Sequence, residues 1–168
     1  MITVAVEERE IIDKIILKNK ICYVGMIDCQ GLPYVIPMNF GYRGNIIYLH
    51  SGPESGSVEA LKKNPNVCIT FSEGHELIWQ NEEVACSYRM KSSSVICRGK
   101  VVFEVDYDKK VEALNIIMSQ YSEREFTYSE PAVNNVLIWK VEIDSLDSKV
   151  FGMPHRNSKN YKEGDFIE

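Results

Sequence analysis

The sequence predicts a mainly β protein, folded as an antiparallel barrel with peripheral helices. Short runs of β-branched and aromatic residues alternate with turns rich in Gly, Asn, Asp and Pro, a pattern typical of strands joined by tight turns. Such turns connect antiparallel neighbours. The chain shows no regular alternation of strands with helices, which argues against a Rossmann fold or a TIM barrel. We expect about six or seven strands and three helices.

Length and composition fit a single globular domain. The chain has 168 residues, of which 45% are hydrophobic and 26% are charged, and this length allows a sizeable core. We expect a domain over residues 1–152 and a polar C-terminal tail over residues 153–168. The net charge of −5 argues against nucleic acid as a partner, because nucleic acid attracts basic surfaces.

The sequence also bears on the compartment. No apolar run approaches the roughly 20 residues that cross a bilayer, and the acidic N-terminus does not resemble a signal peptide. The five cysteines are odd in number and show no C-x-x-C spacing. We therefore expect reduced cysteines that act as small core residues; a disulfide framework or a zinc site is the less favoured alternative. These features predict a cytoplasmic protein that does not enter a membrane.

The first part of the chain predicts a helix followed by two hairpins. Residues 7–19 place their isoleucines on one helical face, and residues 20–27 have the composition of a strand. Turn residues then separate the later apolar runs, and Gly31 is available for a positive φ. The turns are expected at 28–31 and 43–45, and the strands that follow them at 33–42 and 46–50.

The loop from Ser51 to Ser57 is the feature around which the fold is organised. It follows a strand and precedes a short helix at 58–63 and a strand at 67–71. Its backbone N–H groups, its hydroxyls and the positive end of the helix dipole suit an anion such as a phosphate. Simple helix capping by Ser55 or Ser57 is the alternative interpretation.

The second half predicts further strands and one clear amphipathic helix. Residues 107–121 place Val111, Leu114, Ile117, Met118 and Tyr121 on a common face. Gly99 indicates a bulge or a close backbone approach within a long strand. The remaining elements are expected as a turn at 72–76, a short apolar piece at 77–79, strands at 84–88, 95–105 and 136–143, and polar connections at 89–94 and 122–134.

Histidine and a cationic cluster supply the candidate polar groups. His50 ends a strand beside the Ser51–Ser57 loop, where it can contact a bound ring or substrate, although a lone histidine is often structural. His75 and His155 lie in turn-like segments and are expected to be solvated. Because no two of the three histidines are four residues apart, no metal site is predicted. A cationic, hydroxyl-rich cluster is formed by Arg89, Lys91, Ser93 and Ser94. Its two alternative interpretations are a second anion contact and a solvated turn.

Several motifs resemble one known family. These are PMNFGY at 37–42, IYLHS at 47–51, EALKKNPNVC at 59–68, SVICRGKV at 94–101 and VLIWKVEI at 136–143. In this order they resemble the pyridoxamine 5′-phosphate oxidase-like split-barrel superfamily, and within it the nitroimidazole-resistance (Nim-type) flavoproteins. The resemblance covers about residues 5–150. It implies an antiparallel six-stranded split β-barrel that forms a homodimer and binds FMN in clefts at the subunit interface.

The resemblance also implies which residues bind the cofactor. Segment 37–40 would run beside the flavin ring and ribityl chain, and His50 with Ser51 would lie near the ribityl–phosphate end or the substrate. Ser55, Gly56 and Ser57 would hold the phosphate where family members commonly carry Gly-Arg-Lys. The two missing cations imply weaker binding or another cofactor, unless Arg89, Lys91 or Arg98 compensates. The implied cofactor-binding set is Pro37, Met38, Asn39, Phe40, His50, Ser51, Ser55, Gly56, Ser57, Arg89, Lys91, Ser93 and Ser94, with Lys91, Ser93 and Ser94 supplied by the other subunit.

The function expected from this resemblance is an FMN-dependent oxidoreductase. Hydride at the flavin would reduce a small oxidised substrate, for example a nitroaromatic, with NADH or NADPH as a candidate donor and His50 as the candidate catalytic residue. Pyridoxamine phosphate oxidation is less favoured, because the chain lacks an evident match to that enzyme's C-terminal signature. The alternatives are a flavin-binding module without a reaction and a heme-binding split barrel with His50 as a ligand.

Overall fold

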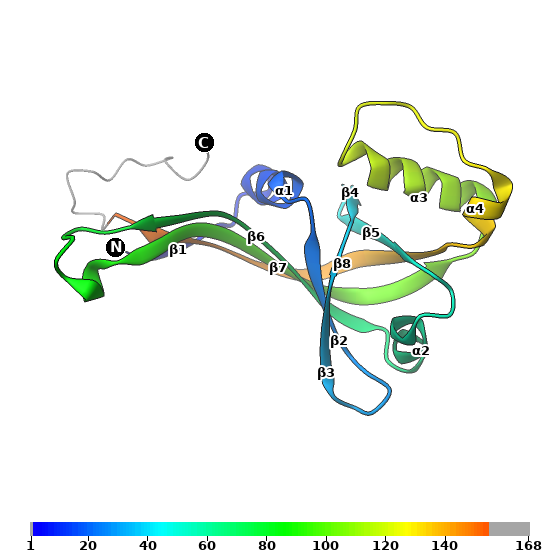
Figure 1. The fold of residues 1–168 in the computed structure, drawn as a ribbon, viewed down its shortest axis with the longest axis horizontal. Helices are drawn as coiled ribbons and strands as arrows, with labels where there is room; N and C mark the ends of the chain where they lie inside the picture. The colour runs from blue at the N-terminus through cyan, green and yellow to red at the C-terminus, as the bar shows by residue number, and fades with distance from the viewer. Residues whose placement is uncertain (1, 155–168) are drawn as a thin grey trace. The chain divides into compact units, whose positions relative to one another are not determined.

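A computed structural model describes residues 2–154 (Figure 1). Residues 155–168, which include His155 and most of the predicted polar tail, lie outside the described residues. The chain divides into two compact units that are each assembled from several stretches of sequence. Among the described residues, unit 1 comprises 2–19, 71–96 and 147–154, and unit 2 comprises 20–70 and 97–146. The expectation of one domain over residues 1–152 stays a prediction.

The secondary structure is mainly β, and the predicted antiparallel architecture is confirmed. The strands are β1 (Ile2–Ala5), β2 (Cys22–Ile27), β3 (Pro33–Met38), β4 (Gly41–Arg43), β5 (Ile46–Ser51), β6 (Asn66–Ile78), β7 (Arg89–Glu104) and β8 (Leu137–Met153). Their hydrogen-bonded order is β3-β2-β6-β7-β8-β5-β4, and β1 pairs with β8. The pairs β1–β8, β2–β3, β2–β6, β4–β5 and β5–β8 are antiparallel.

Two tight turns in unit 2 form where the sequence predicts them. Gly44 and Asn45 both have positive φ, at 58° and 69°, and the flanking residues Arg43 and Ile46 are paired. Two consecutive positive φ values define a type I′ turn, whose twist matches that of paired strands. In the β2–β3 hairpin, the Asp28 carboxylate accepts the N–H groups of Gln30 and Leu32 at 2.8 Å.

The helices of unit 2 are α2 (Gly56–Lys63), α3 (Tyr107–Ser119) and α4 (Glu130–Asn134). The Asp106 carboxylate caps α3 by accepting the Lys109 N–H at 3.1 Å, an arrangement that stabilises a helix N-terminus. The α3 backbone passes close to β4 at Gly41, where a Cβ atom would lie 2.6 Å from the Ile117 nitrogen. Ala113, Ile117 and Ile138 form a buried cluster against which Tyr48 and Tyr121 pack.

Unit 1 contains β1, α1 (Arg9–Lys18), residues 71–78 of β6, residues 89–96 of β7 and residues 147–153 of β8. The buried side of α1 consists of Ile12, Ile15 and Ile16, as its periodicity predicts. The short strand β1 pairs with the end of β8. Among the described residues, no helix is long and apolar enough to cross a membrane.

Several boundaries differ from the sequence prediction because strand pairing overrides local composition. Residues 72–76 were predicted as a turn and residues 89–94 as a polar break, yet both lie inside long strands, β6 and β7. Gly74, with a φ of 70°, is accommodated within β6. The predicted strand at 84–88 is wrong, since residues 85–87 form a short 3-10 helix, η1. Backbone hydrogen bonds from neighbouring strands satisfy a polar segment as well as an apolar one.

Other differences concern the ends of elements. The predicted strand at 33–42 is interrupted at Asn39 and Phe40, which separate β3 from β4. The last strand continues ten residues past its predicted end at Ile143, through Met153. The sequence did not indicate β1 or the short helix α4, which lies in the predicted polar connection 122–134. Pro131 at the start of α4 is typical of a helix N-terminus.

Candidate functional site

An open pocket with a volume of about 610 Å³ lies in unit 2. Pockets of about 300–1,000 Å³ are typical of small-molecule and cofactor sites. Apolar side chains form one part of its lining, and hydroxyl, amide and imidazole groups form the other. The lining residues are Ile21, Ile36, Pro37, Met38, Asn39, His50, Ser51, Ser55, Ser57 and Trp139.

The β2–β3 hairpin supplies most of the apolar lining. Cys22 pairs with Met38 in this hairpin, so Ile21 and Asn39 follow at the same open end. The Cys22 thiol lies 3.6 Å from the Met38 carbonyl oxygen, and burial raises the pKa of Cys22 to about 12. The thiol therefore stays protonated at neutral pH and acts as a packing group and hydrogen-bond donor.

A hydrogen-bonded network organises the polar end. The Trp139 indole N–H donates to the Ser51 hydroxyl oxygen at 3.1 Å, and the Ser55 hydroxyl donates to the same oxygen at 3.4 Å. Ser51 in turn donates to the Gly52 carbonyl at 3.0 Å. A hydroxyl donates one hydrogen bond and accepts two, so these contacts use the full capacity of Ser51. Ser51 therefore ties the loop to β8.

The beginning of α2 faces the pocket through its serines. Ser55 is the N-cap residue, but its side chain makes no capping hydrogen bond. Its carbonyl accepts the N–H groups of Val58 and Glu59. The first N–H groups of a helix have no partner within the helix, which leaves those of Gly56 and Ser57 directed toward the N-terminal end. This end therefore offers N–H donors beside the Ser55 and Ser57 hydroxyls, so capping by a serine side chain does not account for the loop.

His50 lies at the end of β5 and lines the pocket with an exposed side chain. Its backbone pairs with Ile138 of β8. Partial desolvation by the surrounding pocket atoms lowers the pKa of the imidazole below its ordinary value. The imidazole is thus neutral at pH 7, with one nitrogen able to donate a hydrogen bond and the other able to accept one.

The structure brings together many, but not all, of the predicted site residues. Pro37, Met38, Asn39, His50, Ser51, Ser55 and Ser57 line the same pocket. Phe40 is fully buried in the core, and Gly56 is exposed at the first position of α2; neither lines the pocket. Arg89, Lys91, Ser93 and Ser94 lie in unit 1, on the first half of β7, and do not line the pocket either. Arg98 is exposed on the second half of β7.

Sequence reasoning did not assign Ile21, Ile36 or Trp139 to the site. Trp139 was expected only as part of a strand with alternating residues, and a buried tryptophan at such a position is usually a core residue. It is completely buried and packs edge-to-face against Phe103, with the ring centroids 6.4 Å apart. A buried indole needs a hydrogen-bond acceptor, but no sequence pattern placed Trp139 beside the Ser51–Ser57 loop.

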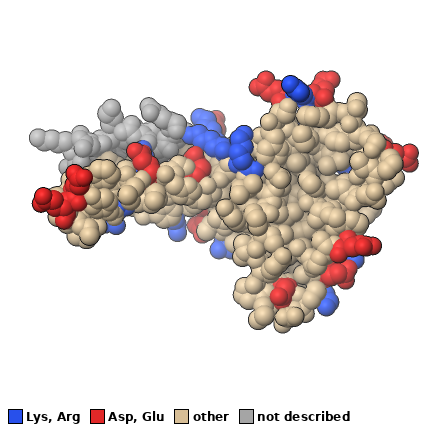
Figure 2. Space-filling model, viewed as in Figure 1, with Lys and Arg blue, Asp and Glu red and all other residues tan. Residues whose placement is uncertain are grey.

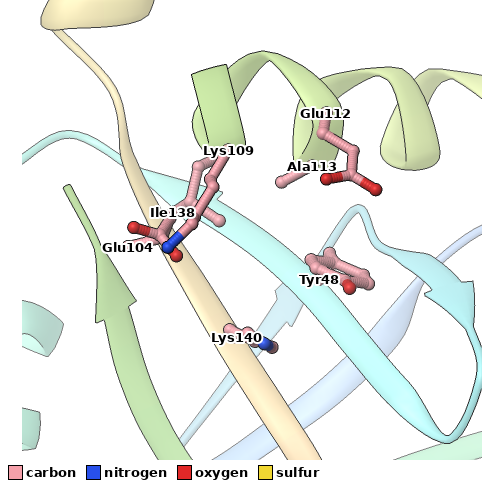
Figure 3. A pocket seen from close by; sticks show the side chains of 7 residues that line it. All are labelled: Tyr48, Glu104, Lys109, Glu112, Ala113, Ile138 and Lys140. Atoms are coloured by element: carbon pink, nitrogen blue, oxygen red, sulfur yellow. The ribbon is translucent and has the colours of Figure 1, made fainter. Parts of the chain in front are cut away.

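A second, much smaller cavity of about 60 Å³ lies between α3 and the sheet (Figure 3). The figure shows Lys109 extending toward Glu104, and Glu112 pointing toward Tyr48. Burial raises the pKa of Tyr48, and the negative charge of Glu112 raises it further. This space suits one or two water molecules, each of which occupies about 30 Å³ in the liquid. It is too small for a cofactor.

Charged side chains are interspersed on the face shown in Figure 2, with broad uncharged areas between them. Aspartate and glutamate lie near lysine and arginine in several places on this face. The ten residues that line the large pocket include neither sign of permanent charge. Recognition in that pocket therefore depends on shape, apolar contact and neutral hydrogen-bonding groups.

Comparisons with known proteins identify the family. Residues 8–150 match the sequence family described as pyridoxamine 5′-phosphate oxidase. The solved structure of a candidate 5-nitroimidazole antibiotic resistance protein from Bacteroides thetaiotaomicron is 51% identical, with 89% of this chain and 87% of that chain covered and a TM-score of 0.81. No curated protein matches the chain.

Two further structures share the fold at lower identity. Flavocytochrome Anf3 from Azotobacter vinelandii is 21% identical over 92% of this chain and 72% of that chain, with a TM-score of 0.78. The FAD and heme binding protein from Mycobacterium smegmatis is 16% identical over 90% of this chain and 75% of that chain, with a TM-score of 0.79. Together with the family match, these likenesses confirm the predicted split-barrel fold: the chain belongs to the pyridoxamine 5′-phosphate oxidase-like split-barrel family.

Proposed function

We propose that the large pocket binds FMN and that the protein is an FMN-dependent oxidoreductase acting on a small oxidised substrate. The observation that carries this proposal is a pocket in which an apolar wall meets a serine-rich helix N-terminus. A flavin mononucleotide has the matching parts, a flat aromatic ring system at one end and a phosphate at the other. The similarity to a candidate 5-nitroimidazole resistance protein favours a nitroaromatic substrate.

The apolar wall fits the flavin ring. Ile21, Ile36 and Met38 offer apolar surface, and Pro37 adds a rigid backbone. The Asn39 side-chain amide can both donate to and accept from the polar edge of a ring. Such a lining, mostly apolar with a few polar groups that fix orientation, is typical of cofactor sites.

The start of α2 fits the phosphate. Backbone N–H groups and the helix dipole favour an anion at this position, and the hydroxyls of Ser55 and Ser57 can donate to phosphate oxygens. The donors are neutral, so they do not neutralise the charge of the phosphate as Lys or Arg would. We propose that Lys91, Ser93 and Ser94 of a second subunit complete the site, with Arg89 or Arg98 as further cations.

When bound, FMN supplies hydride transfer to an oxidised substrate. The protein contributes position: the hairpin residues hold the ring, and the Ser51 network holds the loop that binds the phosphate. His50 lines the pocket with an exposed side chain, where its neutral imidazole can donate one hydrogen bond to the substrate and accept another. We assign His50 as the candidate catalytic residue.

A turnover assay tests the enzymatic part of the proposal. Protein loaded with FMN is mixed with NADH or NADPH and with a 5-nitroimidazole, a nitrobenzene or a quinone, and oxidation of the nicotinamide is followed. We expect reduction of at least one nitro compound at a rate that free FMN does not reach. Bound flavin without turnover for any donor and acceptor would favour a flavin-binding module without a reaction.

The pH profile provides a prediction for His50. Because the folded pKa lies below the ordinary value, His50 is neutral at pH 7, and its protonation below about pH 6.5 should lower turnover. Because a lowered pKa means that protonation is less favourable in the folded state than in the unfolded state, the contribution of His50 to stability also falls as the pH drops through that range. We expect His50→Gln to lower turnover about 10²-fold or more and to remove this acidic limb. The control is His75→Gln, because His75 is exposed and lies outside the pocket. This variant should retain both the turnover and the acidic limb of the profile. An unchanged profile in His50→Gln contradicts the assignment.

We also propose a homodimer, supported by an exposed apolar face on the β2–β3 hairpin. Tyr23 and Val35 are 46% and 61% exposed there. Pro33 and Pro37 lack N–H groups, so the edge of β3 is a poor template for strand addition, and we expect contact through the face. In light scattering, Val35→Lys should shift the protein toward a monomer, whereas Val102→Lys, at a valine that is 64% exposed, should not; a wild-type monomer contradicts the proposal.

A further inference from the structure

Tyr121 follows α3 and joins two backbone segments through its hydroxyl. The hydroxyl donates to the Lys20 carbonyl oxygen at 2.9 Å, and it accepts the Phe40 N–H at 2.8 Å. The two bonded residues are separated by the whole β2–β3 hairpin. A single side-chain oxygen therefore fixes the place where the chain enters this hairpin and the place where it leaves.

Both segments border the large pocket. Lys20 precedes the lining residue Ile21, and Phe40 follows the lining residues Met38 and Asn39. A second contact joins the same regions, since the Lys20 ammonium lies 3.5 Å from the Gln120 carbonyl oxygen. The residues that follow α3 therefore support the apolar wall through these contacts, although they do not line the pocket themselves.

The ring that carries this hydroxyl is itself held in place. Tyr121 packs against the buried cluster of Ala113, Ile117 and Ile138. Gly41, which directly follows Phe40, allows the α3 backbone to approach β4 closely. Since α3 and segment 40–41 are in tight contact, a small displacement of the hydroxyl would be transmitted to Asn39 and Met38.

We propose that Tyr121 is a positioning residue, whose hydroxyl sets the geometry of the ligand-binding wall formed by Ile21, Met38 and Asn39. The inference rests on the proposed function for the identity of the ligand, but the positioning of the wall is a property of the protein alone. Precise placement of binding groups depends on such supporting hydrogen bonds. Loss of the hydroxyl should loosen the wall while the ring preserves the core.

The test compares Tyr121→Phe with the wild type in two measurements. Backbone amide exchange by NMR should become about ten-fold faster at Met38, Asn39 and Phe40, and should stay unchanged at Ile47 and Leu49 of β5. The FMN dissociation constant should rise about ten-fold, as expected for the loss of two hydrogen bonds that hold the wall. The absorption bands of bound FMN should also shift, because the ring environment changes.

Tyr48→Phe is the matched control. Tyr48 packs against the same buried cluster but lines the small cavity and not the large pocket, so its substitution should change neither measurement. Tyr121→Met, which also lacks the hydroxyl, serves as a second variant if Tyr121→Phe does not fold. Both variants are measured well below their unfolding temperatures, so that a fall in stability alone does not alter the affinity.

The outcomes separate this inference from the proposed function. Faster exchange together with weaker FMN binding supports positioning by Tyr121. If wild-type protein binds no FMN, the proposed function fails, and the exchange measurement alone decides the inference. Unchanged exchange at Met38, Asn39 and Phe40 overturns it in either case, and so does faster exchange with unchanged affinity and spectrum of bound FMN.

Discussion

Replacing Gly41 by alanine should destabilise the protein strongly. The added Cβ would lie 2.6 Å from the Ile117 nitrogen and 2.7 Å from the Ile116 carbonyl carbon and oxygen. These are backbone atoms of α3, which cannot rotate away as a side chain can, so the helix must move from β4. Overpacking of this kind costs on the order of 3 kcal/mol, or roughly 6–12 °C in Tm for a protein of this size.

Gly52 supplies the matched control for this prediction. A Cβ at Gly52 meets nothing within 4 Å, and its φ is not in the left-handed region. Gly52→Ala should therefore leave the free energy of unfolding within about 0.5 kcal/mol of the wild type. Urea unfolding followed by circular dichroism measures both variants. Similar stability of Gly41→Ala and Gly52→Ala would contradict the close contact of α3 with β4.

Trp139→Phe should weaken ligand binding more than its modest change in size implies. Phenylalanine keeps an aromatic ring against Phe103 but loses the N–H that donates to Ser51. The Ser51 hydroxyl, which also accepts from Ser55, then loses its side-chain contact with β8, while the backbone pairing of Ser51 with Leu137 remains. We expect the FMN dissociation constant to rise at least about ten-fold, with stability lower by about 1–3 kcal/mol.

The other tryptophan of the chain controls for this experiment. Trp79 is 49% exposed and stacks on Tyr88, with the ring centroids 5.4 Å apart; it does not line the pocket. Trp79→Phe should leave FMN affinity unchanged. Fluorescence gives an independent check, because bound FMN should quench Trp139, whose emission is all that remains in Trp79→Phe. Equal FMN affinity in both variants would show that the indole N–H does not organise the site.

The features that the sequence predicts well are those that depend on residues close together in the chain. The Arg43-Gly44-Asn45 turn forms because Gly44 and Asn45 tolerate positive φ. Likewise, the helix at 9–18 follows from the spacing of its isoleucines. The loop from Ser51 to Ser57 also leads into α2 as expected, since small polar residues followed by an apolar period mark a helix start.

The long strands show what local composition misses. Residues 89–94, a run of cations and serines, gave no strand signal, yet they lie in β7 because the neighbouring strands β6 and β8 supply the hydrogen bonds. Similarly, Gly74 in β6 was interpreted as part of a turn. A strand in the middle of a sheet is stabilised by contacts far away in sequence, which no local pattern contains.

The candidate site also has parts that the sequence predicts and parts that it does not. Segment 37–40 was predicted from motif resemblance and the Ser51–Ser57 loop from its own residues. Both segments contribute to one pocket, although Phe40 does not line it. The link between them runs through Trp139 and Ser51, a contact between residues 88 positions apart. The role of Tyr121 depends on pairs separated by 81 and 101 positions. Such contacts exist only after the chain has folded, so sequence spacing did not indicate them.

FMN binding is the measurement that tests the account most directly. The protein is purified, its absorbance spectrum is recorded, released small molecules are identified by mass spectrometry, and stripped protein is titrated with FMN. We predict a flavin spectrum or saturable binding of added FMN, weakened by Trp139→Phe and unaffected by Trp79→Phe. A colourless protein that binds no added FMN would contradict the central claim, and a Soret band would identify heme as the cofactor instead.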